Sequence, residues 1–372
     1  MIDEHWGYVS DTARTALLER AISKTVRCSD HVLDLGCGVG ILGTLCLQAG
    51  AAGVTAIEST SVADVAREVF ERAGQGEKCN VLQGNANQLK LDRAVDLIVC
   101  DHVGYFGLDY GILALLHDAR TRFLKKEGRI MPMGVDLFLA PVGSEGCAKA
   151  AFGWSAQDIP PEFHWITEHS INHKHAVNLE AKNILGTPFL ADSVDFRTET
   201  RSFFSWKTEL TITRAGEMHG LAGWFDCTLC EGVKMTNSPL NPERINRSQA
   251  FFPLSKPLHV AKNDVLQVTF VLRPDEDLFS WSVEHAPSGW KCRQSTWEGL
   301  ALNAHDMRNA KPDHIPNLTA TAKARAIVLG YCDGQKTVSE IEKAVLKDHP
   351  NLFPTSGAIS QFVASCLGGS TE

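Results

Sequence analysis

An apolar segment that runs directly into closely spaced glycines is the feature that most constrains how this chain can fold. Residues 31–35 are typical of a short buried strand, Gly36, Gly38 and Gly40 follow it, and a helical pattern covers residues 41–48. Glycines let a chain turn tightly and bring its backbone close to a ligand. The pattern predicts the strand, loop and helix that open a parallel α/β sheet.

Strand and helix patterns continue to alternate after this loop. Further strands are expected at residues 54–58, 80–83 and 95–100, and helices at 62–73 and 112–124. Such alternation places helices on the faces of a parallel sheet. We therefore predict a Rossmann-like α/β domain.

The pattern changes after residue 141. Segments rich in β-branched and aromatic residues, separated by turn formers, indicate a β-barrel-like domain, and helical periodicity returns near residue 316. We expect four parts: a helical segment 1–30, a Rossmann-like domain 31–141, a β-barrel domain 142–300 and a helical module 301–372.

Composition excludes several classes of function. A formal charge of −8 argues against nucleic acid as a partner. No apolar run approaches the roughly 18 residues of a membrane span, and the first residues do not resemble a signal peptide, so we expect a cytoplasmic protein. The eleven cysteines follow no framework spacing, and Cys227 and Cys230 are expected to be strand residues, with no metal site.

Two carboxylates help to choose the ligand of the glycine loop. Gly38, Gly40 and Gly43 also fit a dinucleotide spacing, so the glycines alone do not decide. Asp34 precedes the loop, and Glu58 ends the next expected strand, where a carboxylate can accept both ribose hydroxyls. The D-x-G-x-G-x-G segment resembles the first motif of class I methyltransferases, which implies S-adenosylmethionine as the cofactor. Its expected binding residues are Arg14, Asp34, Gly36, Gly38, Gly40, Glu58 and Asn87.

Segments 95–113, 124–132 and 139–142 resemble the protein arginine methyltransferase family. The resemblance implies that Arg14, in a D-x-x-R-T segment, binds the methionyl carboxylate of the cofactor. It also implies a homodimer formed through an arm, which we place at residues 155–195.

The residues that hold the acceptor depart from this family. Two family glutamates clamp the substrate guanidinium, whereas this chain has Asp101 at the first position and Tyr110, preceded by Asp109, at the second. Asn246 and Arg247 stand where the family has a T-H-W loop, and a buried arginine would repel a guanidinium. The expected acceptor-site residues are Asp101, His102 as a possible base, Tyr105, Asp109, Tyr110, Asn246 and Arg247.

Segment 317–367 resembles the small domain of the pyrroloquinoline-quinone peptide chaperone, whose relatives bind leader peptides. This resemblance implies a leader peptide as a partner, and a helical cap that packs on the barrel is the alternative. Together the features predict a methyltransferase that N-methylates a peptide or another amino-acid-derived small molecule in a biosynthetic pathway. An arginine methyltransferase with an unusual clamp and a non-catalytic cofactor-binding subunit are the alternatives.

Overall fold

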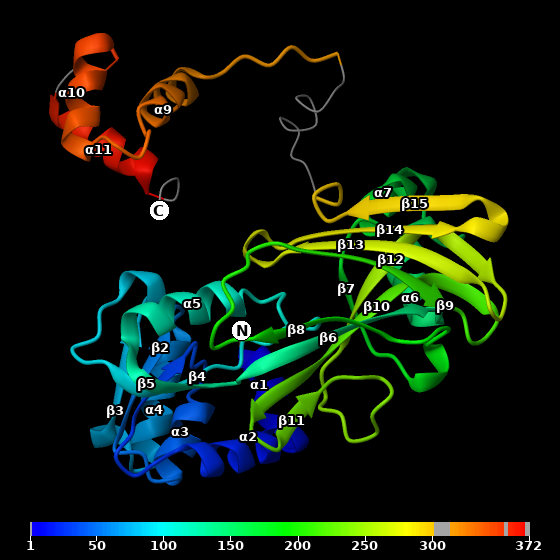
Figure 1. The fold of residues 1–372 in the computed structure, drawn as a ribbon, viewed down its shortest axis with the longest axis horizontal. Helices are drawn as coiled ribbons and strands as arrows, with labels where there is room; N and C mark the ends of the chain where they lie inside the picture. The colour runs from blue at the N-terminus through cyan, green and yellow to red at the C-terminus, as the bar shows by residue number, and fades with distance from the viewer. Residues whose placement is uncertain (1, 301–312, 353–355, 369–372) are drawn as a thin grey trace. The chain divides into compact units, whose positions relative to one another are not determined.

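The computed structural model describes residues 2–300, 313–352 and 356–368 (Figure 1). It contains two compact units, residues 1–300 and residues 301–372. Within the described residues, no helix has the length and apolar character needed to cross a membrane.

The first part of the larger unit is a parallel five-stranded sheet with the order β3-β2-β1-β4-β5. Its strands are β1 (His31–Leu35), β2 (Gly53–Glu58), β3 (Cys79–Gln83), β4 (Val95–Val99) and β5 (Leu124–Met131). The helices between them are α3 (Ile41–Gln48), α4 (Val62–Arg72) and α5 (Ile112–Phe123). β2 is buried along its whole length, as expected for a central strand of a parallel sheet. The predicted Rossmann-like fold is confirmed.

Two helices precede the sheet, α1 (Ile2–Ser10) and α2 (Thr12–Thr25). Asp11 lies between them, and its Oδ1 accepts a hydrogen bond from the backbone nitrogen of Arg14 at 3.0 Å. This N-cap satisfies one of the free N–H groups at the start of α2. It also fixes where α2 begins, and therefore where Arg14 lies.

Two antiparallel sheets form the barrel-like domain. The larger contains β6 (Gly134–Val142), β7 (His175–Val177), β8 (Phe189–Asp195), β10 (Gly216–Cys230), β11 (Val233–Thr236) and β12 (Gln249–Val260). The smaller contains β9 (Phe204–Thr211), β13 (Val265–Arg273), β14 (Leu278–His285) and β15 (Trp290–Ser295). The predicted barrel-like domain is confirmed, and Cys227 and Cys230 are both buried in β10.

The segment proposed as a dimerisation arm, residues 155–195, does not form one continuous projection. It includes β7 and β8, which are hydrogen-bonded strands of the larger sheet. The helices α6 (Glu145–Phe152) and α7 (Thr167–Ser170) lie before β7. Short 3-10 turns occur at Gly76–Lys78, Ala86–Gln88, Gly153–Ser155, Pro161–Ile166, Ala181–Asn183, Pro274–Glu276 and Ala286–Ser288.

The loop after β4 joins β4 to α5 in the parallel-sheet domain and packs against the barrel-like domain. Phe106 packs edge-on against Phe252 and Phe270 of the barrel, with ring centroids 5.8 and 5.6 Å apart. Asn237 Nδ2 donates to the carbonyl of Tyr105 at 2.9 Å. These contacts hold the loop, which carries most of the expected acceptor-site residues, against a rigid aromatic core.

The smaller unit contains three described helices, α9 (Ala320–Gly330), α10 (Val338–Asp348) and α11 (Ser356–Leu367). They share a small apolar core, and Thr337 and Glu340 form a capping box at the start of α10. The expected C-terminal helices are confirmed.

Candidate cofactor and acceptor site

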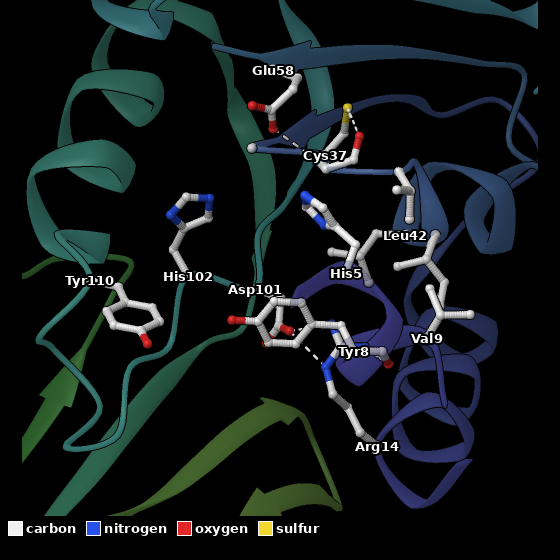
Figure 2. Close-up of a pocket in the computed structure, with 14 residues that line it drawn as sticks. His5, Tyr8, Val9, Arg14, Cys37, Leu42, Glu58, Asp101, His102 and Tyr110 are labelled. Carbon is white, nitrogen blue, oxygen red and sulfur yellow. Dashed lines mark hydrogen bonds and ion pairs between the residues drawn. The ribbon is translucent and has the colours of Figure 1, made fainter. Parts of the chain in front are cut away.

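A pocket opens above the glycine loop, at the carboxyl ends of β1, β2 and β4 (Figure 2). This is the edge of a doubly wound sheet where ligands normally bind. It is lined by His5, Tyr8, Val9, Arg14, Gly36, Cys37, Gly38, Val39, Ile41, Leu42, Glu58, Asp101, His102 and Tyr110. Seven of the residues predicted to bind the cofactor or the acceptor therefore line one pocket: Arg14, Gly36, Gly38, Glu58, Asp101, His102 and Tyr110.

The glycine loop requires glycine for both conformation and space. Gly36, Gly38 and Gly40 have φ values of 71°, 52° and 86°, in the left-handed region. A Cβ at Gly36 would lie 2.0 Å from His102 Nε2, and one at Gly38 would lie 2.8 Å from His5 Cε1. Gly40 is the N-cap of α3 and faces the core instead of the pocket. The loop therefore leaves its backbone open to a bound group.

The two carboxylates expected at the cofactor site, Glu58 and Asp34, make different contacts. Glu58 accepts hydrogen bonds from the backbone nitrogens of Gly38 at 3.1 Å and Thr60 at 2.9 Å, and it faces the pocket. Asp34 is buried beneath the loop, where its Oδ2 accepts from the backbone nitrogen of Gly43 at 2.8 Å. Burial raises the pKa of Asp34 to about 7. Asp34 shapes the loop, and Glu58 is the residue available to a ligand.

Asp101 is ion-paired with two buried arginines. Arg14 Nε donates to Asp101 Oδ2 at 2.8 Å, and a second bond runs from Nη2 of Arg14. Nη2 of Arg247 lies 3.5 Å from the same oxygen, while its Nη1 donates to the carbonyl of Val103. The guanidinium groups of both arginines lie over the ring of Tyr8, at 5.5 and 5.4 Å from its centroid. One carboxylate therefore faces two permanent positive charges.

The second acidic side chain of the loop is also paired. Asp109 is buried, accepts from the backbone nitrogens of Tyr105 and Phe106, and forms an ion pair with Lys174 Nζ at 2.9 Å. Tyr110 lines the pocket, and its ring contacts that of Tyr105 edge-on at 5.6 Å. Burial raises the pKa of the Tyr110 hydroxyl, so this group is neutral at neutral pH.

Three other predicted residues lie in different surroundings. Asn87 is exposed on the turn after β3 and does not line the pocket. Asn246 is exposed, and its backbone nitrogen donates to Asp11 Oδ2 at 2.8 Å. Tyr105 lines a neighbouring hollow together with Tyr110. Of the two residues that stand at the family's T-H-W loop, Asn246 and Arg247, only Arg247 contacts an acceptor-site residue through its side chain, by pairing with Asp101 in the described structure.

Sequence reasoning missed three aromatic or charged side chains of the site, besides several smaller lining residues. His5 and Tyr8 come from α1, and Lys174, which pairs with Asp109, comes from just before β7. The aromatic cluster His-Trp-Gly-Tyr at residues 5–8 was the available signal for α1. No local pattern marks Lys174, because its partner is 65 residues away in the sequence.

The pocket fits S-adenosylmethionine by its own chemistry. The glycine loop offers backbone that a Cβ would block, and Glu58 offers a carboxylate suited to ribose hydroxyls. Arg14 supplies a guanidinium for a carboxylate, although Asp101 already occupies two of its donors.

Comparisons with known proteins agree with this fold. Residues 32–128 match the methyltransferase domain family, and residues 171–305 match the PRMT5 oligomerisation domain family. A probable protein arginine N-methyltransferase 6 from Arabidopsis thaliana is 25% identical over 77% of this chain and 66% of its own length. Protein arginine N-methyltransferase 6 from Xenopus laevis is 28% identical over 73% of this chain and 84% of its own length.

Solved structures show the same fold. The Trypanosoma brucei PRMT1 enzyme–prozyme complex with AdoHcy aligns with a TM-score of 0.68 at 22% identity, covering 78% of this chain and 96% of that one. Arabidopsis thaliana protein arginine methyltransferase 10 aligns equally well, covering 80% and 98%. The chain spans just under two thirds of the length of several relatives, 66% and 61% in two plant proteins. Matches and fold together show that the larger unit contains a methyltransferase domain, and that its two domains resemble those of the protein arginine methyltransferases.

Proposed function

We propose that this protein transfers a methyl group from S-adenosylmethionine to a neutral nucleophile of a peptide or amino-acid-derived acceptor, rather than to an arginine guanidinium. One observation carries the proposal. Both acidic side chains of the loop after β4 are already ion-paired, Asp101 with Arg14 and Arg247, and Asp109 with Lys174.

A guanidinium is an unsuitable acceptor for this arrangement. It stays charged at every accessible pH and is best held by two carboxylates. Tyr110, at the second clamp position, is neutral. Arg247, which is only 9% exposed, adds a positive charge next to Asp101. Repulsion in such a poorly hydrated place is stronger than in water. An amine that has lost its proton, or another neutral nucleophile, avoids this cost.

The chemistry needs positioning more than acid–base catalysis. Bound S-adenosylmethionine supplies an electrophilic methyl group, and displacement requires the nucleophile in line with it. Glu58 and the loop around Gly38 hold the ribose side of the pocket, and Arg14 lies where it can orient a carboxylate. His102 and Tyr110 line the same pocket (Figure 2), so His102 Nε2 is the group placed to accept the proton of the acceptor.

A second candidate function, cofactor binding without transfer, has some support. Asp101 is occupied by arginines, and one similar solved structure is described as an enzyme–prozyme complex with AdoHcy. A subunit of that kind would bind the cofactor and modify nothing by itself.

The test combines binding and transfer. Calorimetry with S-adenosylmethionine comes first, followed by transfer of radiolabelled methyl groups to peptides that differ only in one residue, Arg, Lys, Ser or a free amino terminus. We expect binding, no label on the arginine peptide, and label on an amine or hydroxyl acceptor. Efficient labelling of arginine would overturn the proposal. Binding without transfer to any acceptor would favour the second candidate.

Assembly and the C-terminal unit belong to the same proposal. The match of residues 171–305 to an oligomerisation domain supports the expected homodimer. A leader peptide is proposed for the helices α9 to α11, which lie beyond the residues that match either family. We expect the acceptor to be a cytoplasmic peptide or metabolite.

A further inference from the structure

A second, basic cleft lies apart from the cofactor pocket. It consists of two adjoining hollows that share Thr25, Arg129 and Cys230 as lining residues. The cleft runs between the end of α2, the strand β5 and the turn that joins β10 to β11. None of its lining residues lines the pocket above the glycine loop.

Positive charge is concentrated in this cleft, although the chain carries a net charge of −8. Its lining includes one acidic residue, Glu231, against seven basic residues. The basic residues are Lys24, Arg27, Arg120, Lys125, Lys126, Arg129 and Arg197. A cleft lined by one sign of charge attracts ligands of the opposite sign.

Much of this charge is not neutralised within the described part of the chain. Lys125, Arg129 and Arg197 have carboxylate partners, whereas Lys24, Arg27 and Lys126 form no ion pair there. Arg120 donates to the backbone carbonyls of Phe196 and Glu199, at 2.8 and 3.1 Å, rather than to a carboxylate. Those two bonds fix the guanidinium without cancelling its charge. The cleft therefore keeps an excess of positive charge.

The uncharged part of the lining is apolar and contains no aromatic ring. It is formed mainly by Leu124, Ile130, Met133 and Leu229. Single-stranded nucleic acids are usually held by rings on which their bases stack, and this lining offers none. A ligand that combines negative charge with aliphatic side chains fits the surface better.

The backbone of β5 brings two lysines to the cleft. β5 is the last strand of the parallel sheet, with β4 as its one strand partner in the described residues. Leu124 pairs with Val95 and Arg129 with Leu97, so residues 125–128 bulge out of the sheet and bring Lys125 and Lys126 to the cleft.

We propose that this cleft binds an acidic peptide segment whose Asp and Glu residues alternate with aliphatic ones. The carboxylates contact the rim formed by Lys24, Arg27 and Lys126, and the aliphatic side chains contact the half-buried floor around Leu124 and Met133. The site is separate from the methyl-transfer pocket and does not depend on the function proposed for it.

Fluorescence anisotropy with a labelled peptide of alternating Glu and Leu residues tests the proposal on the full chain without S-adenosylmethionine. The comparison probes are a Glu-only peptide, a Lys–Leu peptide and a labelled single-stranded oligonucleotide. We expect the Glu–Leu peptide to bind best, with an affinity that falls as salt rises. The double variant R27E/K126E should weaken it roughly tenfold or more.

The matched control is the double variant K256E/K262E, which changes two exposed lysines that lie outside the cleft and form no ion pair in the described residues. It should leave the affinity unchanged, and thermal unfolding of each variant shows whether the fold is intact. Equal binding by R27E/K126E and the wild type would overturn the proposal. So would a preference for the oligonucleotide that disappears in the double variant, because the cleft would then be a nucleic-acid site.

Discussion

Arg14 Nε donates to Asp101 Oδ2 at 2.8 Å, which joins helix α2 to the loop that follows β4. The arginine expected to bind the cofactor and the carboxylate expected to bind the acceptor are therefore partners of each other. With Arg247 at the same carboxylate, the cluster has more positive than negative charge. A carboxylate of the cofactor, which would complete the pairing of Arg14, fits this imbalance better than a cationic acceptor does.

Removing the carboxylate of this cluster should destabilise the protein strongly. Asp101→Ala leaves Arg14 and Arg247 buried without their shared partner, at 3% and 9% exposure. Breaking a buried ion pair in this way typically costs about 3–5 kcal/mol of unfolding free energy. Urea denaturation measures the change. The control is Asp64→Ala, whose exposed pair with Arg67 should contribute less than about 1 kcal/mol, and similar losses in both variants would refute the structural role of Asp101.

Loss of Glu58 should weaken cofactor binding. Glu58→Ala removes the carboxylate that faces the pocket and the acceptor for the backbone nitrogen of Gly38. Hydrogen bonds to a charged group contribute about 1.5–3 kcal/mol, so the affinity for S-adenosylmethionine should fall by roughly tenfold or more. Isothermal calorimetry gives the affinity. Glu68→Ala, on the exposed face of α4, should bind as the wild type does. An unchanged affinity in Glu58→Ala would contradict the assignment.

Asp34 should make stability depend on pH. Burial raises its pKa from 3.8 to about 7, with the charges of Glu58 and Asp101 acting in the same direction. Between these values the folded protein holds a proton that the unfolded chain has lost. The free energy of unfolding therefore falls as pH rises through this range, by up to about 1.4 kcal/mol per pH unit from this group.

The variant Asp34→Asn removes this titration. The unfolding free energy of the variant should increase relative to that of the wild type as pH rises from about 5 to about 8. Denaturant unfolding of both proteins at several pH values measures this difference. A difference between the two proteins that stays constant across this range would mean that Asp34 is ionised in the folded state throughout.

Light scattering should give a dimer mass, twice the 40.7 kDa of one chain. The reason is the match of residues 171–305 to an oligomerisation domain, together with the two-domain fold shared with the Trypanosoma brucei enzyme–prozyme complex. A monomer mass at high protein concentration would contradict this expectation.

Local signals were enough for the fold class and for the placement of Gly36, Gly38 and Glu58 in the pocket. The strand, glycine loop and helix at residues 31–48 are specified by neighbours in sequence, since φ values near +70° favour glycine and buried parallel strands favour apolar runs. Glu58 could be placed because the ends of adjacent parallel strands meet at one edge of the sheet. The alternation of elements then specified the parallel sheet.

Only the tertiary structure decided the state of the acceptor site. Sequence placed Asp101 and Asp109 on one loop but left open whether they were free to bind a substrate. Folding brings Arg14 from α2, Arg247 from the barrel and Lys174 from beside β7 to these two carboxylates. Once packing brings these charges together in a poorly hydrated interior, leaving any of them unpaired would be costly. No local pattern contains that information, because the partners belong to separate elements whose packing determines which of them meet.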